Sequence, residues 1–457
     1  MYHGVVRQPF ESKPKPRSVN ETSPDADEPP ARLAVGPSDA AAVPGGVVPR
    51  RHELLQNRSF ALLWGGQLVS MIGLQCLIVA GITLIADVSH SPLALLIPAL
   101  CVTAPQVVLG LMGGVIADRL SRKRVMIISD LARALIVLTL LLVTTPGQIW
   151  ILYAAAAGLA LAGAFFDPAR NASLPRLVPD HSLIAANGLI QSSHVIALIL
   201  GPVIGGFALE LWQPSAFLLA SGAFVVSAAA VTLMRIPPNG RVAAEAGQTN
   251  LFRDVRDGLA FIRCSRVLRR VLAVTAVATL GAGAVLLLAI PHLKTTVGAG
   301  GLQYGIAMSA LGLGSLLGCG LVTRLGQGVA ATTMVGGMLI LAGAAIVAFA
   351  YAPGYAVVLA SVALIGMCLV VARGTLDALT QTVAPDEMRG RVQSAVHILI
   401  VSSAAAAAGF AAVLGSLVPP EIVFVAAAAT TTAAGLAALL ALREAADALR
   451  TVVAQPS

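Results

Sequence analysis

The sequence predicts an all-α membrane protein with twelve transmembrane helices in two pseudo-symmetric six-helix bundles. First, 57% of the 457 residues are hydrophobic and only 11% are charged, whereas about a quarter of a soluble domain is charged. Second, apolar segments of about 20 residues, the length that crosses a bilayer core, recur from residue 60 almost to the C-terminus. Third, two short sequence matches repeat at nearly one separation, which indicates duplicated halves.

The predicted spans form two sets of six. The spans of the first half cover 60–86, 92–117, 124–144, 148–169, 186–209 and 213–234. The spans of the second half cover 271–293, 302–323, 329–350, 355–380, 392–417 and 421–442.

The remaining segments complete the expected domain organisation. Residues 1–55 are rich in Pro, Ser, Asp and Glu and have no apolar run, so we expect a disordered cytoplasmic tail. The first bundle then covers 56–235 and the second 271–445, with a short cytoplasmic tail at 446–457. The linker at 236–270 opens with helix breakers and continues from Leu251 with apolar residues at helical spacing between arginines, which predicts an amphipathic helix on the inner leaflet.

The positions of the basic residues predict the orientation. Every second connection carries arginines, among them Arg122, Arg176, Arg256 and Arg389, whereas the other connections carry only Lys294. Because cytoplasmic loops retain Lys and Arg, both termini are expected in the cytoplasm. The net charge of +8 is therefore a topology signal, and we expect no nucleic-acid partner.

An internal sequence repeat supports two halves of six spans each. Pro179 and Asp180 match Pro385 and Asp386 at an offset of 206, and the segment 113–119 matches 318–324 at an offset of 205. Transporters built from such repeats place their site at the repeat interface.

The connection after the second span reads GGVIADRLSRKRVM from Gly113 to Met126. It resembles the loop signature of the major facilitator superfamily, G-x-L-A-D-R-x-G-R-K-x-x-L, although Ser121 replaces the second glycine. The residues in register, which the resemblance identifies as a conformational switch between the halves, are Gly114, Asp118, Arg119, Arg122 and Lys123. The alternative is a topology signal alone.

The fifth span contains GPVIGG, formed by Gly201, Pro202, Gly205 and Gly206. This string resembles the antiporter signature of the same superfamily, with Ala197 in place of its first glycine. Because proline removes a backbone donor and glycines allow close packing, we expect a bent, tightly packed helix.

Further strings at 57–60, 166–170 and 389–392 look like the twelve-span drug and proton antiporters, which include macrolide efflux and enterobactin export proteins. The resemblance implies a secondary active transporter in a bacterial inner membrane. It would export small amphipathic molecules such as drugs by proton antiport with alternating access. The alternatives are a dedicated exporter of a metabolite such as a siderophore, a lipid transporter, and a non-transporting membrane sensor.

Charged residues inside spans cost about 2.5–3.5 kcal/mol each on insertion scales, so they indicate function. Three pairs lie at i, i+3 or i+4, hence on one helix face. The pairs, which are candidates for coupling and gating, are Asp130 with Arg133, Asp167 with Arg170, and Arg373 with Asp377. Static ion pairing is the alternative for each.

The resemblance also implies which helices line the central cavity, namely the first, fourth, seventh and tenth. The candidate substrate contacts on them are Gln67, Ser70, Gln75, Phe165 and Phe166. Glutamine and serine also hydrogen-bond neighbouring helices in membranes.

Other functions find little support in the sequence. Five cysteines are scattered without metal-ligand spacing, there is no nucleotide-binding loop with its lysine, and no nucleophile or carboxylate pair converges at one depth. We therefore expect no enzyme activity, no cofactor and no metal. The expected partners are membrane lipid, a small-molecule substrate and protons, for a monomer.

Overall fold

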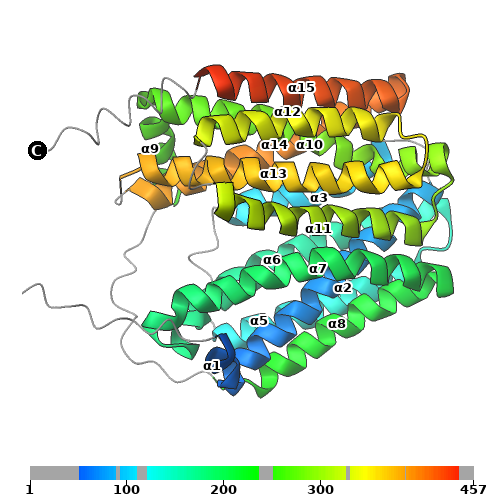
Figure 1. The fold of residues 1–457 in the computed structure, drawn as a ribbon. Helices are drawn as coiled ribbons and strands as arrows, with labels where there is room; N and C mark the ends of the chain where they lie inside the picture. The colour runs from blue at the N-terminus through cyan, green and yellow to red at the C-terminus, as the bar shows by residue number, and fades with distance from the viewer. Residues whose placement is uncertain are drawn as a thin grey trace, which may run out of the picture. The chain divides into compact units, whose positions relative to one another are not determined.

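The computed structural model describes residues 51–88, 93–110, 121–235, 251–325, 330–385 and 388–441. All regular structure in these ranges is helical. Eleven of the described helices are long and apolar enough to cross a membrane, and a shorter apolar stretch, Leu93–Thr103, begins the second predicted span. The predicted all-α membrane fold is confirmed (Figure 1), while residues 111–117 of the second span lie outside the described ranges.

The first half begins with a short helix, α1 (Arg51–Gln56). Its membrane helices are α2 (Arg58–Val88), α3 (Leu93–Gly110), α5 (Arg122–Thr139), α6 (Ile149–Leu177), α7 (Leu183–Leu211) and α8 (Gln213–Leu233). Three short 3₁₀ turns lie between them, at Leu140–Leu142, Pro146–Gln148 and Asp180–Ser182.

The second half begins with α9 (Leu251–Cys264), an amphipathic helix. Its membrane helices are α10 (Arg266–Val297), α11 (Gly301–Leu325), α12 (Ala331–Ala350), α13 (Tyr355–Val383), α14 (Arg389–Leu417) and α15 (Pro420–Ala441).

Helix packing repeats between the halves. In the first half α2 packs on α7 and α8, α5 packs on α6 and α8, and α3 packs on α6. In the second half α10 packs on α14 and α15, α12 packs on α13 and α15, and α11 packs on α13. Each of these helix pairs in the second half corresponds to the pair that lies six spans earlier in the chain. The two bundles are therefore pseudo-symmetric.

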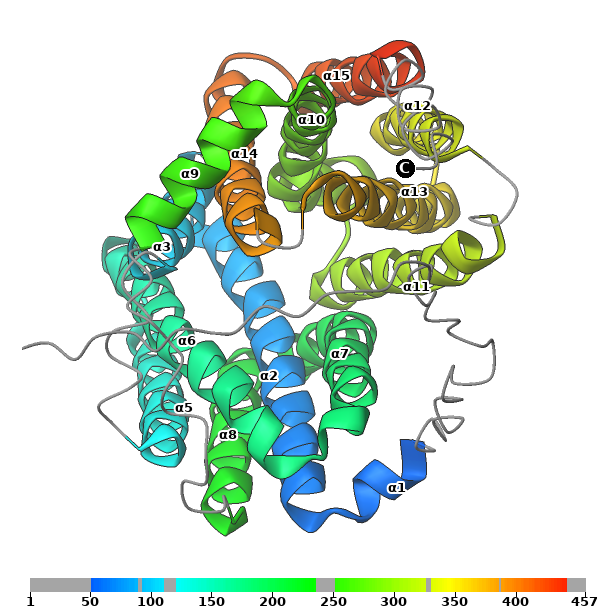
Figure 2. The same cartoon turned by 90° about the vertical axis from the view of Figure 1, so that its left-hand side faces the viewer.

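The bundles meet mainly through two pairs of helices, α7 with α11 and α3 with α14, and α2 makes smaller contacts with α10 and α11. These two pairs are equivalent under the repeat. The fifth span (α7) corresponds to the eleventh (α14), and the eighth span (α11) corresponds to the second (α3). Figure 2 looks along the helices and shows α7 beside α11, and α3 beside α14. The contact surface between the bundles therefore follows the repeat.

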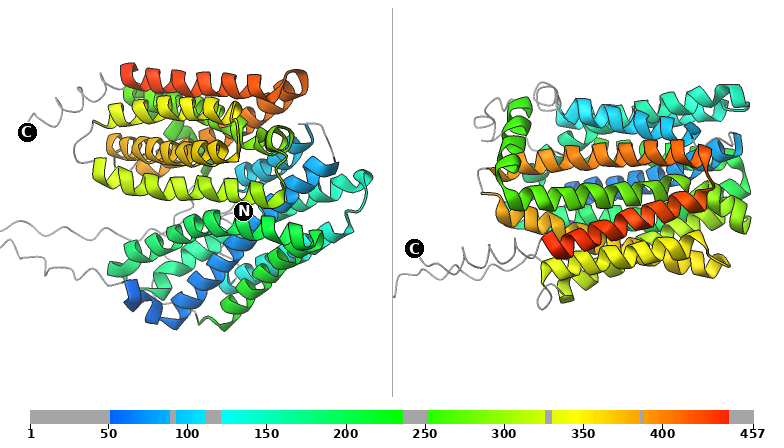
Figure 3. Two further views of the ribbon diagram at one scale, coloured as in Figure 1. Left: turned by 45° about the vertical axis from the view of Figure 1, so that its right-hand side comes forward. Right: turned by 90° about the horizontal axis from the view of Figure 1, so that it is seen from above.

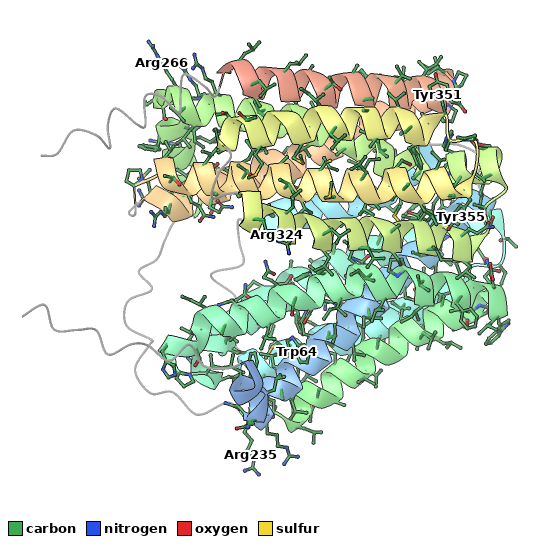
Figure 4. All side chains as sticks on the ribbon, in the orientation of Figure 1. Trp64, Arg235, Arg266, Arg324, Tyr351 and Tyr355 are labelled. Atoms are coloured by element: carbon green, nitrogen blue, oxygen red, sulfur yellow. The ribbon has the colours of Figure 1, made fainter. Side chains whose placement is uncertain are left out.

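The two ends of the helices differ in charge. We call the end that carries Arg235, Arg266 and Arg324 the basic end, and the end that carries Tyr351 and Tyr355 the opposite end (Figure 4). Helix α9 packs against α14 and α10 and runs across the helix ends on the basic side (Figure 3). A helix with one apolar face in that position suits a membrane interface.

Large apolar side chains lie both inside and outside the bundles. Phe60, Phe224 and Phe424 are fully buried, whereas Leu135 and Phe410 are 67% and 74% exposed on membrane helices. An apolar exterior is what a lipid-facing surface requires.

Several helices run further than their predicted ends, α6 and α10 by the most. Helix α6 continues through Pro168 and Pro175 to Leu177, beyond the expected end at 169. Helix α10 likewise continues through Pro291 to Val297 instead of ending at 293. Proline is tolerated inside membrane helices because neighbouring groups satisfy the freed carbonyls, so Pro175 does not end α6.

Candidate functional site

The interior of the first bundle contains an ion pair. The Asp130 carboxylate on α5 is fully buried, and its Oδ1 lies 3.2 Å from Nη1 of Arg133 one turn later. The spacing i, i+3 places both side chains on one face of α5. A charge buried at this depth needs a partner, and Arg133 provides it.

Aromatic rings hold the Arg133 guanidinium in place. Its central carbon lies 4.8 Å from the Phe166 ring centroid on α6 and 5.7 Å from that of Phe224 on α8. Gly163 on α6 leaves room for it, because a Cβ there would lie 3.1 Å from Nη2. The cation is therefore held between two rings, an arrangement that stabilises it further.

The second oxygen of Asp130 has no such partner. Asp130 Oδ2 and the Ser227 hydroxyl are both buried, and neither has a hydrogen-bond partner by distance and angle among the described residues. Ser227 on α8 nevertheless lies against this carboxyl. Asp130 Oδ2 and the Ser227 hydroxyl are therefore two neighbouring polar groups in the buried interior of the first bundle.

The second predicted pair lies one helix away, on α6. Asp167 Oδ1 and Arg170 Nη1 are 3.1 Å apart, and Arg170 also donates to the Asn171 side chain. Asp167 is 57% exposed while Arg170 is buried. Asp167 and Arg170 are also near enough to act electrostatically on Arg133.

The third predicted pair lies on α13, with Arg373 Nε 2.8 Å from Asp377 Oδ2. Both residues line a cavity of about 500 Å³ inside the second bundle. All three predicted ion pairs are thus formed, but the structure brings them together in two separate places, one in each bundle.

Only part of the switch motif can be described. Arg122 donates to the Ala172 carbonyl on α6, and Lys123 donates to the carbonyls of Thr232 and Met234 at the end of α8, both at 2.7 Å. A cation at a helix C-terminus satisfies unpaired carbonyls. These bonds lie within the first bundle. The predicted partners Gly114, Asp118 and Arg119 lie outside the described residues.

The GPVIGG motif lies where three helices meet. Gly201 and Gly205 face the α2 backbone, while Pro202 and Gly206 face α11. A Cβ on Gly206 would come within 2.5 Å of the Gly301 carbonyl oxygen, so a larger residue would push the bundles apart. Beside it, the Ser309 hydroxyl on α11 donates to the Ile199 carbonyl at 2.5 Å. The motif therefore forms the close seam between the bundles.

The predicted cavity residues are dispersed. Gln67 and Ser70 are buried, and Gln67 Oε1 has no hydrogen-bond partner within the described ranges. Gln75 and Phe165 are half-buried, and Gln75 packs against Gly201. Phe166 is 1% exposed beneath Arg133, so its ring lies inside the first bundle.

One ion pair between the bundles was not predicted from the sequence. Lys294 near the end of α10 bonds Asp87 at the end of α2, at the opposite end from the arginines. Close by, His292 lies 3.6 Å from Glu421. The signal was available, because Lys294 is the one basic residue on that set of connections and Asp87 ends an apolar span.

The described interior thus contains three ion pairs and one cavity that Arg373 and Asp377 line. No group of three or more metal-ligating side chains occurs in the part of the chain that the structure describes.

Comparisons with known proteins agree with the fold. A family model described as Major Facilitator Superfamily matches residues 63–409. Macrolide efflux protein A from Streptococcus pyogenes is 32% identical over 209 residues, which cover 45% of this chain and 51% of that protein. The multidrug efflux pump Tap from Mycolicibacterium fortuitum is 29% identical over 329 residues, covering 69% and 79%. The match to the macrolide protein thus spans about half of its length.

Solved transporters share the architecture. The nucleoside transporter NupG has a TM-score of 0.66 at 13% identity, covering 85% of this chain and 99% of that one. A bacterial homologue of the human lysosomal transporter Spinster also reaches 0.66, at 14% identity, covering 86% and 97%. At these identities the likeness is one of fold.

Proposed function

The chain belongs to the major facilitator superfamily, and on this premise we propose that it exports small amphipathic molecules from the cytoplasm in exchange for protons. Membership makes it a transporter rather than an enzyme. It is embedded in lipid and transports a small molecule. The identity of the substrate and the source of the driving force are what we propose.

The observation that carries the proposal is the buried carboxyl of Asp130. Oδ2 and the Ser227 hydroxyl oxygen are both without hydrogen-bond partners among the described residues. A proton on Oδ2 would form an O–H group that can donate a hydrogen bond to the hydroxyl oxygen of Ser227. It would also remove the charge that holds Arg133, so that Arg133 would come under the influence of Asp167. Protonation would thereby rearrange the charges inside one bundle, as a proton-coupled switch requires.

The seam between the bundles supports alternating access. The close contacts of α7 with α11 and the Asp87–Lys294 pair lie toward the opposite end. Figure 1 shows α7 and α11 converging toward that end and diverging toward the basic end. We propose that this conformation opens toward the basic end. The motif of Gly114, Asp118, Arg119, Arg122 and Lys123 would latch the halves at the basic end in the alternative conformation.

The direction and the class of substrate rest on the relatives. Macrolide efflux protein A and the Tap pump carry efflux in their names, which supports export. The arginines of the basic end support a cytoplasmic location for both termini, in a bacterial inner membrane. Inward movement of one proton charge would then supply about 2.3 kcal/mol per 100 mV.

The proposal is tested by ethidium accumulation in drug-sensitive bacteria that express the wild type or Asp130→Asn. Asparagine has the shape of the carboxyl but cannot take up the proton. We expect the wild type to lower ethidium accumulation severalfold, an uncoupler to abolish this effect, and Asp130→Asn to lose it at equal expression. Glu210→Gln is the matched control, because it removes an exposed carboxylate at the end of α7.

Two results would contradict the proposal. Uncoupler-sensitive export by Asp130→Asn at the wild-type rate would refute the role of this carboxyl. Equal accumulation in all strains at confirmed expression would refute broad drug export and favour a dedicated exporter of a metabolite or a lipid.

A further inference from the structure

Three arginines line a surface groove at the start of α10. Arg266, Arg269 and Arg270 belong to the first two turns of this helix, and Ala273 completes the lining. Positions three, four and seven residues after Arg266 lie on the same face of a helix as Arg266 itself. The groove is separate from the cavity of the second bundle, because the two share no lining residue.

This face of α10 is open to its surroundings. Arg266, Arg269 and Ala273 are exposed, and Figure 4 shows Arg266 at the basic end of the helices. The guanidinium groups of Arg266 and Arg269 take part in no ion pair or hydrogen bond among the described residues. Arg270 is half-buried and donates to the Ala441 carbonyl at the end of α15, at 3.1 Å. Two cations of the groove are thus able to meet a ligand, while the third is held against the neighbouring helix.

The stability of α10 does not explain why these cations are gathered here. The N-terminus of a helix carries a partial positive charge, so arginines in the first turns are unfavourable there. Ser265 already caps this end by accepting a hydrogen bond from the Leu268 amide. Helix α2, which has the equivalent place in the first bundle, carries only Arg58 in its first two turns. An anion in the groove would offset the charge that α10 concentrates at this point.

The groove extends from a charged end to an apolar end. From Arg266 to Ala273 the helix rises about 10 Å, at 1.5 Å per residue. The headgroup region of one leaflet is about 5–8 Å deep, so Ala273 lies at the level where the hydrocarbon begins if Arg266 lies at the membrane surface. Helix α9, which leads into α10, runs across the helix ends on the same side (Figure 3), as expected at a membrane interface. A molecule in the groove therefore has its anionic part beside the guanidinium groups and its apolar part beside Ala273.

We infer that this groove binds an anionic phospholipid, with the phosphate at Arg266 and Arg269 and an acyl chain over Ala273. A guanidinium group presents two parallel N–H donors that match a pair of phosphate oxygens. Basic pockets beside membrane helices are suited to lipid headgroups of this charge. The inference does not depend on the proposed export of drugs. A soluble phosphate ester has the same headgroup chemistry but no acyl chain, and this difference separates the two sources in the tests below.

The first test is native mass spectrometry of the purified full chain in detergent, titrated with dioleoyl phosphatidylglycerol or dioleoyl phosphatidylcholine. We expect the first molecule of phosphatidylglycerol to bind at least tenfold more tightly than phosphatidylcholine, which has the same acyl chains and no net charge. Arg266→Gln combined with Arg269→Gln should weaken binding of phosphatidylglycerol at least tenfold. Arg256→Gln combined with Arg263→Gln is the matched control, because it removes two charges from exposed positions of α9; it should change the affinity less than twofold.

Two results of this titration would overturn the inference. Equal losses in the two double variants would show a diffuse attraction to the basic surface instead of a site. Equal affinities of the wild type for the two lipids would show that the headgroup charge is not recognised. All four substituted arginines are exposed, and the thermal midpoint of each variant checks that the chain is folded.

The second test separates a lipid from a soluble phosphate ester. Ala273→Trp fills the path of the acyl chain and keeps the guanidinium groups, so it should weaken binding of phosphatidylglycerol at least fivefold. Ala229→Trp, at an exposed position near the end of α8, should have no effect. A hundredfold excess of glycerol 3-phosphate, which carries the phosphate without an acyl chain, should not displace the lipid. Displacement by glycerol 3-phosphate, or binding of wild-type strength in Ala273→Trp, would overturn the assignment to a lipid.

Discussion

At the scale of single residues, the Asp130–Arg133 pair shows what the sequence can and cannot reveal. Two opposite charges three residues apart inside an apolar span are visible in the sequence, because each is costly unless paired. The groups around them come from α6 and α8, at least thirty residues away along the chain. Phe166, Phe224 and Ser227 therefore become recognisable as neighbours of this pair only once the helices are packed.

A first prediction concerns the energy of that pair. Arg133→Met removes the cation and leaves Asp130 buried without its partner, which should destabilise the chain by about 3–5 kcal/mol. Asp130→Asn combined with Arg133→Met removes both charges and should recover most of that loss. The measurement is the free energy of unfolding in mixed micelles, with Arg124→Met at an exposed site of the same helix as the control. Equal losses in the single and double variants would show that the charges do not depend on each other.

At the scale of the helices, the α7–α11 seam depends on small residues that let the two backbones come close together. Pro202 cannot donate to the Leu198 carbonyl, and Gly312 of α11 packs against that carbonyl oxygen, which a Cβ would approach to 3.0 Å. At Gly305 a Cβ would overlap the Pro202 carbonyl oxygen. Small residues that allow such close approach are a common basis of helix association in membranes.

We therefore predict that Gly305→Ala weakens the seam. The added methyl group must displace α7 or α11, which costs about 1–3 kcal/mol in a packed interior. Thermal unfolding in detergent should show a lower midpoint for Gly305→Ala than for the wild type. Gly222→Ala on α8 is the matched control, because this glycine is exposed and a Cβ there meets no described atom within 4 Å. A similar midpoint for both variants would mean that the seam adapts without cost.

Sequence periodicity and length located the membrane helices well, since lipid demands long apolar runs. The beginning of α8 and that of α13 agree with the predicted spans. The ends of α6 and α10 do not. In α6, Pro175 would stop a helix in water but is accommodated here. The cavity beside Arg373 could not be predicted from the sequence, because it lies between five helices that meet only in the folded chain. The predicted contacts instead lay in the first half, around Gln67 and Phe165.

At the scale of the whole molecule, the repeat explains how two sites with different properties arise from one plan. Equivalent helix pairs build both bundles, but the first encloses a buried charge pair and the second a cavity lined by Arg373 and Asp377. We propose that protonation in the first bundle changes the contacts between the two bundles. The surface between the bundles must then carry the coupling, since a change in one can reach the other only through their contacts.

The last prediction tests whether that surface opens at the end where Lys294 meets Asp87. The two side chains are 28% and 53% exposed, so the pair is worth at most about 1 kcal/mol. A shift of that size changes a two-state ratio about fivefold. In a chain whose five cysteines are replaced, Ser309→Cys places a thiol in the seam, where residue 309 is buried. Lys294→Gln should raise its labelling by an impermeant maleimide in intact cells up to about fivefold.

Exchanging the charges, with Asp87→Lys and Lys294→Asp together, should return labelling to the starting rate, because the pair forms again in reverse. The cysteine-free chain without Ser309→Cys sets the background. An unchanged rate in Lys294→Gln would show that the pair does not hold the bundles together. Equal rates in Lys294→Gln and the exchanged pair, both above the starting rate, would show that the residue identities matter and the charge does not. The predicted pattern requires instead that this end opens and closes through a contact between the first and seventh spans.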